Sequence, residues 1–311
     1  MEREVLYSFN GLYRDDFRIT GFRFGHGEKT MCVVGTMRGN ENQQLYCCSR
    51  LVERLRALEA EGALTEGHEI LVIPCANPYS INVRKRFWST DNTDINRMFP
   101  GYDMGETTQR IAAGLFSRIQ DFRFGAQFAS FYMPGAFVPH VRVMKTGFQD
   151  TDLARTFGLP YVVVHTPRPF DTTTLNYNWQ IWETKAFSVY STNTARLDRD
   201  SAETAVEAVL RFMARQGLLR CELPEAGPSR VVVSDEFVPV RATDSGFFEC
   251  FAGVGEHVRK GSVIARIRDP YDGTIRRELT APVSGIVAFA ADEPMTYENT
   301  AVIKLIRDEE Q

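Results

Sequence analysis

The feature that most constrains the fold is the alternation of short apolar runs with amphipathic stretches along residues 1–222. Apolar residues recur at helical spacing in three other stretches, and a further helix is expected between the last two apolar runs. The runs typical of buried strands are residues 31–36, 69–74, 123–133, 161–165 and 185–190. The stretches with helical spacing are residues 45–60, 107–119 and 202–213. This alternation predicts an α/β sheet covered by helices on both faces.

The pattern of apolar runs and turn-forming residues changes near residue 222. Residues 223–230 are rich in turn formers and predict a linker. Residues 231–311 hold only short apolar runs separated by Gly and Asp turns, which predicts a small all-β domain. The segments 253–261 and 281–287 resemble turns of the barrel-sandwich fold of biotinyl and lipoyl carriers. The second segment has no lysine, which argues against a carrier role.

Composition excludes several classes of function. The net charge of −4 argues against a general affinity for nucleic acid or for an anionic membrane. No apolar run approaches the roughly 20 residues that span a bilayer, and the N-terminus has no signal core, so we expect a cytoplasmic protein. None of the six cysteines forms a CxxC pair, so no zinc ribbon or thioredoxin motif is expected.

Three segments at predicted strand ends carry the candidate chemistry: residues 35–41 (GTMRGNE), 74–78 (PCANP) and 84–101. In open α/β sheets, ligands bind at the carboxyl ends of strands. These segments resemble the succinylglutamate desuccinylase/aspartoacylase family, relatives of the zinc carboxypeptidases. The resemblance is carried by DINRMFPG at 94–101, by Asn77-Pro78 and by Arg86-Phe87. It covers about residues 20–220 and, more weakly, the C-terminal domain.

The resemblance implies a mixed central sheet of the zinc carboxypeptidase type and an appended β domain near the cleft. In the family, two histidines and a glutamate hold a zinc ion that activates water and polarises the acyl carbonyl. A separate glutamate is the general base. The resemblance implies that Arg86 helps to polarise the carbonyl and that Asn96 and Arg97 bind the substrate carboxylate. Arg38 is expected to add a further positive charge to this pocket.

The sequence departs from the family pattern at the metal site. Arg38 stands where the first zinc histidine is expected, whereas the glutamate ligand is retained as Glu41. Ala129 takes the place of the second histidine, and Tyr190 or the next residue takes that of the base. Glu183 is nearby in sequence but is expected on the preceding helix. A guanidinium at Arg38 repels Zn²⁺, and we expect it to pair with Glu41 instead.

Three functions remain open. The first is a non-catalytic relative that binds a small carboxylate, such as an N-acyl amino acid, and needs no cofactor. The second is an active deacylase with a rearranged zinc site or metal-free chemistry, in which Glu41, Glu183, Tyr190 and His165 are the groups to suspect. The third is a scaffold, in which Arg86 and Arg97 are tied up internally. The sequence does not indicate an oligomeric state.

Overall fold

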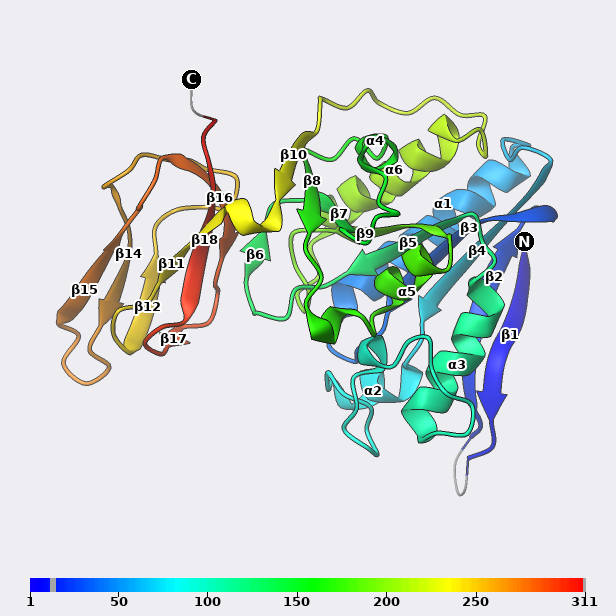
Figure 1. Cartoon of the computed structure of the whole chain (residues 1–311), viewed down its shortest axis with the longest axis horizontal. Helices are drawn as coiled ribbons and strands as arrows, with labels where there is room; N and C mark the ends of the chain where they lie inside the picture. Colours follow the sequence, from blue (N-terminus) through cyan, green and yellow to red (C-terminus); the bar gives the residue numbers. More distant parts are fainter. Residues whose placement is uncertain (12–14, 310–311) are drawn as a thin grey trace. The chain divides into compact units, whose positions relative to one another are not determined.

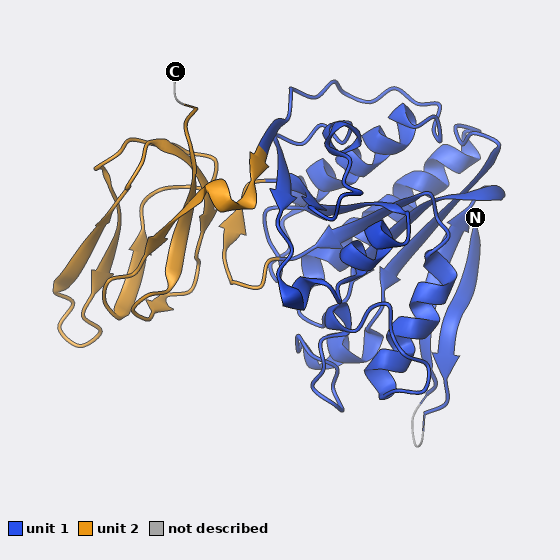
Figure 2. Cartoon of the chain, viewed as in Figure 1, with its two compact units in different colours: residues 1–130, 139–231 blue, residues 131–138, 232–311 orange. Residues whose placement is uncertain are grey.

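The computed structural model describes residues 1–11 and 15–309, which form two compact units (Figure 2). One unit comprises residues 1–130 and 139–231, and the other comprises residues 131–138 and 232–311. The expected first domain, residues 1–222, differs from the first unit in two ways. The unit continues to Val231, because β10 (Arg230–Val233) joins its sheet. Residues 131–138 belong instead to the second unit, because β6 (Ala136–Phe137) pairs with β16 (Gly285–Ala290) of that unit.

In the described residues of the first unit, nine strands form one sheet in the order β1-β2-β4-β3-β5-β9-β7-β8-β10 (Figure 1). The strands are β1 (Glu2–Phe9), β2 (Phe17–Phe24), β3 (Gly27–Thr36), β4 (Gly67–Cys75), β5 (Phe124–Ala129), β7 (His140–Met144), β8 (Tyr161–His165), β9 (Lys185–Tyr190) and β10. β4, β3, β5 and β9 run parallel, whereas β7 runs antiparallel to β9. The sheet is therefore mixed, as the resemblance implied.

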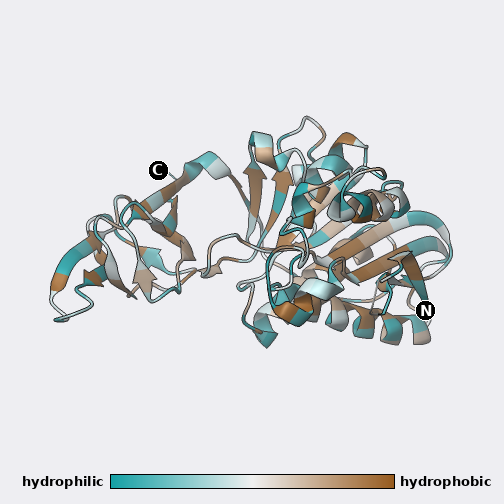
Figure 3. Cartoon of the chain, turned by 90° about the horizontal axis from the view of Figure 1, so that it is seen from below, coloured by the Kyte–Doolittle hydropathy of each residue, from teal (hydrophilic) through white to brown (hydrophobic). Residues whose placement is uncertain are grey.

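Helices cover both faces of this sheet, whose strands are rich in hydrophobic residues (Figure 3). Each face has its own apolar core. On one face, α1 and α6 pack against the strands through residues such as Leu51, Leu55 and Val206. On the other face, α3 and α5 contribute residues such as Ile111, Leu115 and Trp179. The helices of this unit are α1 (Asn42–Ala60), α2 (Pro78–Val83), α3 (Thr107–Ile119), α4 (Thr151–Arg155), α5 (Leu175–Ile181) and α6 (Arg199–Arg215), with short 3₁₀ turns η1 (Ile95–Arg97) and η2 (Pro169–Asp171). The predicted fold class is confirmed.

The second unit consists of antiparallel sheets around a separate core that includes Ile264, Val287 and Leu305. One sheet has the order β11-β18-β16-β13, with β6 beside β16, and the other has the order β15-β14-β12-β17. Besides η3 (Ser234–Glu236), the elements are β11 (Phe237–Arg241), β12 (Gly246–Cys250), β13 (His257–Val258), β14 (Val263–Arg268), β15 (Ile275–Thr280), β16 (Gly285–Ala290), β17 (Met295–Thr296) and β18 (Ala301–Arg307). The prediction of a C-terminal β region is confirmed.

Candidate functional site

The candidate site lies where the central parallel strands end. Thr36, the last residue of β3, pairs with Cys75 of β4, and Ala129 of β5 pairs with Tyr190 of β9. β7 enters the sheet at the same edge, with His140 opposite Tyr190. The loops that follow β3 and β4 therefore start side by side. This places the three segments that the sequence singled out at one edge of the sheet.

A buried ion-pair network occupies the loop after β3. The Arg38 Nη1 atom lies 2.9 Å from Glu41 Oε1, and its Nε lies 3.0 Å from both carboxylate oxygens of Asp94. Arg38 is 5% exposed and Glu41 is 1% exposed. Ser130 donates a hydrogen bond to Glu41 and also lies 3.4 Å from the Arg38 guanidinium. The predicted Arg38–Glu41 pair is confirmed, and Asp94 is a second carboxylate in it.

Local backbone geometry holds Glu41 in place. Its Oε2 accepts hydrogen bonds from the N–H groups of Met37 and Arg38, at 2.8 and 3.0 Å. The close turn depends on Gly39, because a Cβ there would lie 1.9 Å from the carbonyl oxygen of Ser80. The turn is also tied to the next loop by the hydrogen bond from the Gly39 N–H to the Lys85 carbonyl. These contacts bring Glu41 and the guanidinium of Arg38 together within one turn of chain.

The charges of this network shift the pKa of each arginine. Burial lowers the pKa of Arg38, but the carboxylates of Glu41 and Asp94 outweigh burial and raise it above its usual value. Burial and the neighbouring Arg38 charge lower the pKa of Arg86, although Asp94 opposes this effect. Arg86 Nη2 lies 3.1 Å from Asp94 Oδ2. Asp94 thus bridges two guanidinium groups, and Arg38 stays protonated.

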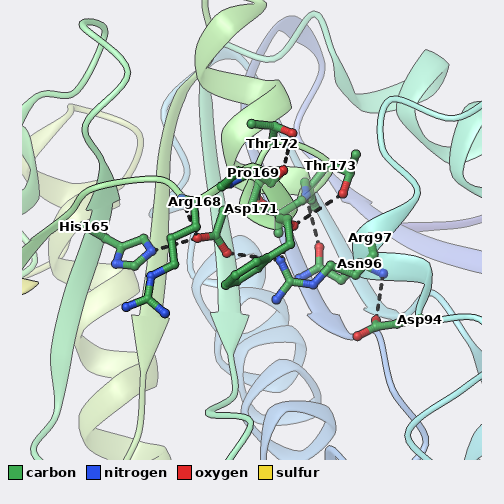
Figure 4. Close-up of polar contacts among 12 residues, drawn as sticks. Asp94, Asn96, Arg97, His165, Arg168, Pro169, Asp171, Thr172 and Thr173 are labelled. Carbon is green, nitrogen blue, oxygen red and sulfur yellow. Dashed lines mark hydrogen bonds and ion pairs between the residues drawn. The ribbon is translucent and has the colours of Figure 1, made fainter.

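The loop of residues 94–97 is fixed by its own side chains (Figure 4). Asp94 Oδ1 accepts the Asn96 N–H at 3.1 Å and so caps η1. Asn96 Oδ1 accepts the N–H of Leu175, the first residue of α5, at 3.1 Å. These bonds tie a loop that follows β4 to a helix that precedes β9.

Asp171 is the shared acceptor of a second polar cluster, which includes Arg97 (Figure 4). Its Oδ1 lies 3.1 Å from Arg97 Nη1, and its Oδ2 lies 3.0 Å from both His165 Nε2 and the Arg168 N–H. Burial raises the pKa of Asp171, but the hydrogen bonds from His165, Arg168 and Arg97 together lower it below its usual value. Asp171 was not singled out from the sequence. The available signal was its position six residues after His165, which ends β8.

Tyr190 lies at the end of β9 and is 1% exposed. Its ring stacks on the His140 ring with a centroid distance of 4.3 Å, and the Arg142 guanidinium lies 5.1 Å from the ring centroid. Burial raises the pKa of Tyr190, although the charges of Arg142 and Arg38 oppose this effect. The phenol is therefore neutral at pH 7, in a cationic setting.

Glu183 is not brought into this cluster. It is exposed, has a left-handed backbone (φ 72°) just after α5, and precedes the first residue of β9. Tyr190 is the last residue of that strand, so about 17 Å of extended chain separates Lys185 from it. The structure thus places the predicted catalytic candidate Glu183 at the start of β9, whereas Arg38 lies in the loop at the ends of the parallel strands, beside Tyr190.

The residues around Glu41 do not fit a zinc ion. Within residues 1–11 and 15–309, no group of three or more His, Cys, Asp or Glu side chains is placed to hold a metal. Both Glu41 oxygens already accept hydrogen bonds, and a guanidinium lies against one of them. Ala129 offers no side-chain donor atom, and a guanidinium supplies no lone pair for a metal. Across the same described ranges, no helix is long and apolar enough to cross a bilayer.

The chain resembles known proteins along most of its length. Residues 27–215 match the succinylglutamate desuccinylase/aspartoacylase catalytic domain. An N-alpha-acetyl-L-2,4-diaminobutyric acid deacetylase from Halomonas elongata is 24% identical over 285 residues, which cover 87% of this chain and 79% of the relative.

Solved structures share the fold. A succinylglutamate desuccinylase from a Silicibacter species has a TM-score of 0.80 and 20% identity, covering 94% of this chain and 90% of the other. A product-bound ectoine utilization protein from Ruegeria pomeroyi has a TM-score of 0.76 and 19% identity, covering 94% and 89%. Together with the domain match, these likenesses lead to one conclusion: the chain belongs to the succinylglutamate desuccinylase/aspartoacylase family.

Proposed function

We propose that this chain binds a small carboxylate, such as an N-acyl amino acid, without zinc-dependent hydrolysis. The observation that carries the proposal is the guanidinium of Arg38, which lies 2.9 Å from Glu41 in a fully buried pair. In the family pattern, this pair of positions belongs to a zinc histidine and a zinc glutamate. An internal cation there neutralises the carboxylate that otherwise holds the metal.

In this proposal Arg38 is a structural cation and binds no ligand. All its contacts are made within the protein, to Glu41, Asp94 and Ser130, and it is almost inaccessible to solvent. The sequence had suggested that Arg38 adds to the ligand pocket. Its burial between two carboxylates argues for the structural role instead, because a guanidinium that is already neutralised attracts an external anion weakly.

In this proposal, Arg86 and Arg97 bind the carboxylate of the ligand. Their side chains are 26% and 30% exposed, whereas their partners Asp94 and Asp171 are buried. Each arginine uses one terminal nitrogen for its carboxylate partner, so other N–H donors of the fork remain for a ligand. The scaffold hypothesis predicts that Arg86 and Arg97 form internal pairs of this kind. The remaining exposure of both side chains favours binding over a purely structural role.

A second candidate function is a deacylase with a rearranged, metal-free site. It is favoured by the hydrogen bond between His165 and Asp171, which can orient an imidazole as a general base for water. It is also favoured by the name of the Halomonas elongata relative, a deacetylase. Among the groups suspected from the sequence, Glu41 is committed to Arg38, Glu183 is remote, and the Tyr190 phenol stays neutral because burial raises its pKa. His165 is therefore the strongest candidate for the base.

Thermal stabilisation by a panel of N-acetyl amino acids tests the proposal. We expect several ligands to raise the melting temperature of the wild type and Arg97→Ala to abolish the rise. Arg118→Ala, an exposed residue in the last turn of α3, is the matched control and should keep it. A shift that survives in Arg97→Ala contradicts the proposal.

Metal content and turnover separate the two candidate functions. We expect elemental analysis to find no retained zinc in protein purified without chelator, either before or after dialysis against zinc. Near-stoichiometric zinc would reject the proposal of a metal-free site. Amide hydrolysis of the same panel that is lost in His165→Gln would establish the second candidate instead.

A further inference from the structure

Asp171 is bonded both to Arg97, which the proposed function assigns to the ligand, and to a histidine. Its Oδ1 atom lies 3.1 Å from Arg97 Nη1, and its Oδ2 atom lies 3.0 Å from His165 Nε2 (Figure 4). Arg97 belongs to η1, whereas His165 is the last residue of β8. The fold thus brings a ligand-binding arginine and a titratable ring to the same carboxylate.

The Asp171 carboxylate is fixed in position and in charge. Its side chain is 9% exposed, its Oδ2 also accepts the Arg168 N–H at 3.0 Å, and the Thr174 hydroxyl donates to its carbonyl at 2.7 Å. Burial raises the pKa of Asp171, but the hydrogen bonds from His165, Arg168 and Arg97 outweigh burial and lower it below its usual value. Asp171 therefore stays ionised over the pH range in which a histidine gains a proton.

The His165 ring lies on the face of the sheet that carries α5. Val162 and Val164 of β8 pack in the core of the opposite face, together with α4, so the alternation of side chains places His165 on the α5 face. The His165 side chain is 19% exposed, and α5 has no charged residue. Besides Asp171, the charged residues of the elements around this ring are Arg97 in η1, Arg142 in β7, Lys145 just after β7, Arg168 just before η2 and Arg230 at the start of β10. All of these are cations, so an imidazolium at His165 has Asp171 as its carboxylate partner.

The net charge of Arg97, Asp171 and His165 depends on the protonation of the histidine. With a neutral imidazole, the charges of Arg97 and Asp171 cancel. With an imidazolium, one positive charge remains, on the far side of Asp171 from Arg97. An anion bound at Arg97 is attracted to this additional charge, because the guanidinium keeps its own proton throughout and Asp171 is already ionised.

We propose that His165 is a pH-dependent switch of the ligand site, whose protonation raises the affinity of Arg97 for the ligand carboxylate. This inference rests on the proposed function, in which Arg86 and Arg97 bind that carboxylate. Arg86 pairs with Asp94, so its contribution to binding does not change with the charge at Asp171. Because coupling between two sites is reciprocal, a bound carboxylate favours the imidazolium, and ligand binding takes up a proton. The affinity of the site then rises as the pH falls through the range in which histidine titrates.

Calorimetric titration with N-acetyl-L-alanine and N-acetyl-L-leucine, each of which has one carboxylate, tests the inference between about pH 8 and about pH 5.5. We expect the affinity of the wild type to rise by about three- to tenfold as the pH falls over this range, as for one unit charge several ångströms from the ligand. Titrations at about pH 6.5 in buffers of different ionisation enthalpy should show net proton uptake on binding. His165→Gln, whose amide N–H can still donate to Asp171, should bind with a pH-independent affinity and without proton uptake.

The controls separate this inference from the proposed function. His257→Gln is the matched control, because His257 Nε2 lies 2.9 Å from Asp308 Oδ2 in a similar pair of the second unit; it should keep the pH dependence of the wild type. An affinity of the wild type that is equal at both ends of the pH range, or a rise that survives in His165→Gln, overturns the inference alone. If His165→Gln does not fold, proton uptake by the wild type carries the test, and its absence overturns the inference. Binding of neither compound by the wild type at any pH overturns the proposed function itself.

Discussion

Replacing Arg38 by Met removes the cation at the centre of the buried network. Glu41, which is 1% exposed, then keeps only the N–H groups of the preceding turn and the Ser130 hydroxyl, whereas Asp94 keeps Arg86. Breaking a buried ion pair by removing one partner costs about 3–5 kcal/mol of the free energy of unfolding. Because both carboxylates retain other partners, we expect the lower end, about 3 kcal/mol.

Thermal and urea unfolding at pH 7, followed by circular dichroism, measure this loss. For a unit of this size, a loss of about 3 kcal/mol lowers the melting temperature by about 6–12 °C. The matched control is Arg155→Met, because Arg155 pairs with Asp152 on the surface, where the side chains are 52% and 89% exposed. An exposed pair of this kind contributes about 1 kcal/mol or less.

A double-mutant cycle tests the physical reasoning behind this magnitude. Arg38→Met, Glu41→Gln and the double variant should show a coupling of about 0.5–3 kcal/mol, since the two side chains share one buried contact. If Arg38→Met costs no more than Arg155→Met, the buried pair does not stabilise the turn after β3. The reasoning that an internal cation takes the place of a metal would then be refuted.

Three further predictions concern other parts of the site. Asp171→Asn should lower the free energy of unfolding at neutral pH, because His165 and the other partners lower the pKa of Asp171 on folding. The difference in the free energy of unfolding from wild type should shrink as the pH falls below about 4. Unfolding at a series of pH values measures this difference. Glu183→Gln should leave ligand affinity unchanged, because Glu183 is exposed at the start of β9, at the other end of that strand from Tyr190; a loss of affinity in calorimetry would contradict its placement outside the site. Burial raises the pKa of Cys47 to about 12, so it should react with a thiol reagent only after unfolding, whereas the exposed Cys250 should react in the native state.

The sequence was sufficient for five strands of the sheet, β3, β4, β5, β8 and β9, whereas β1, β2, β7 and β10 were not predicted from it. Strands such as β3, β8 and β9 and helices such as α3 and α6 are set by apolar periodicity, which depends on near neighbours in the chain. The Arg38–Glu41 pair was also predictable, because the two residues lie three positions apart in one turn. Identification of the loop at Asp94–Arg97 as a site segment needed only its resemblance to the family motif.

The tertiary structure alone decided which charges neutralise one another. Asp94 lies 56 residues from Arg38, and Asp171 lies 74 residues from Arg97, so each contact depends on strand order and loop closure. The same is true of Arg142, whose neighbour Tyr190 comes from an antiparallel strand. Periodicity can place a charged residue at a sheet edge, but it carries no information on which distant carboxylate lies beside it. Whether an arginine is structural or free to bind a ligand therefore depends on contacts that form only when the strands assemble.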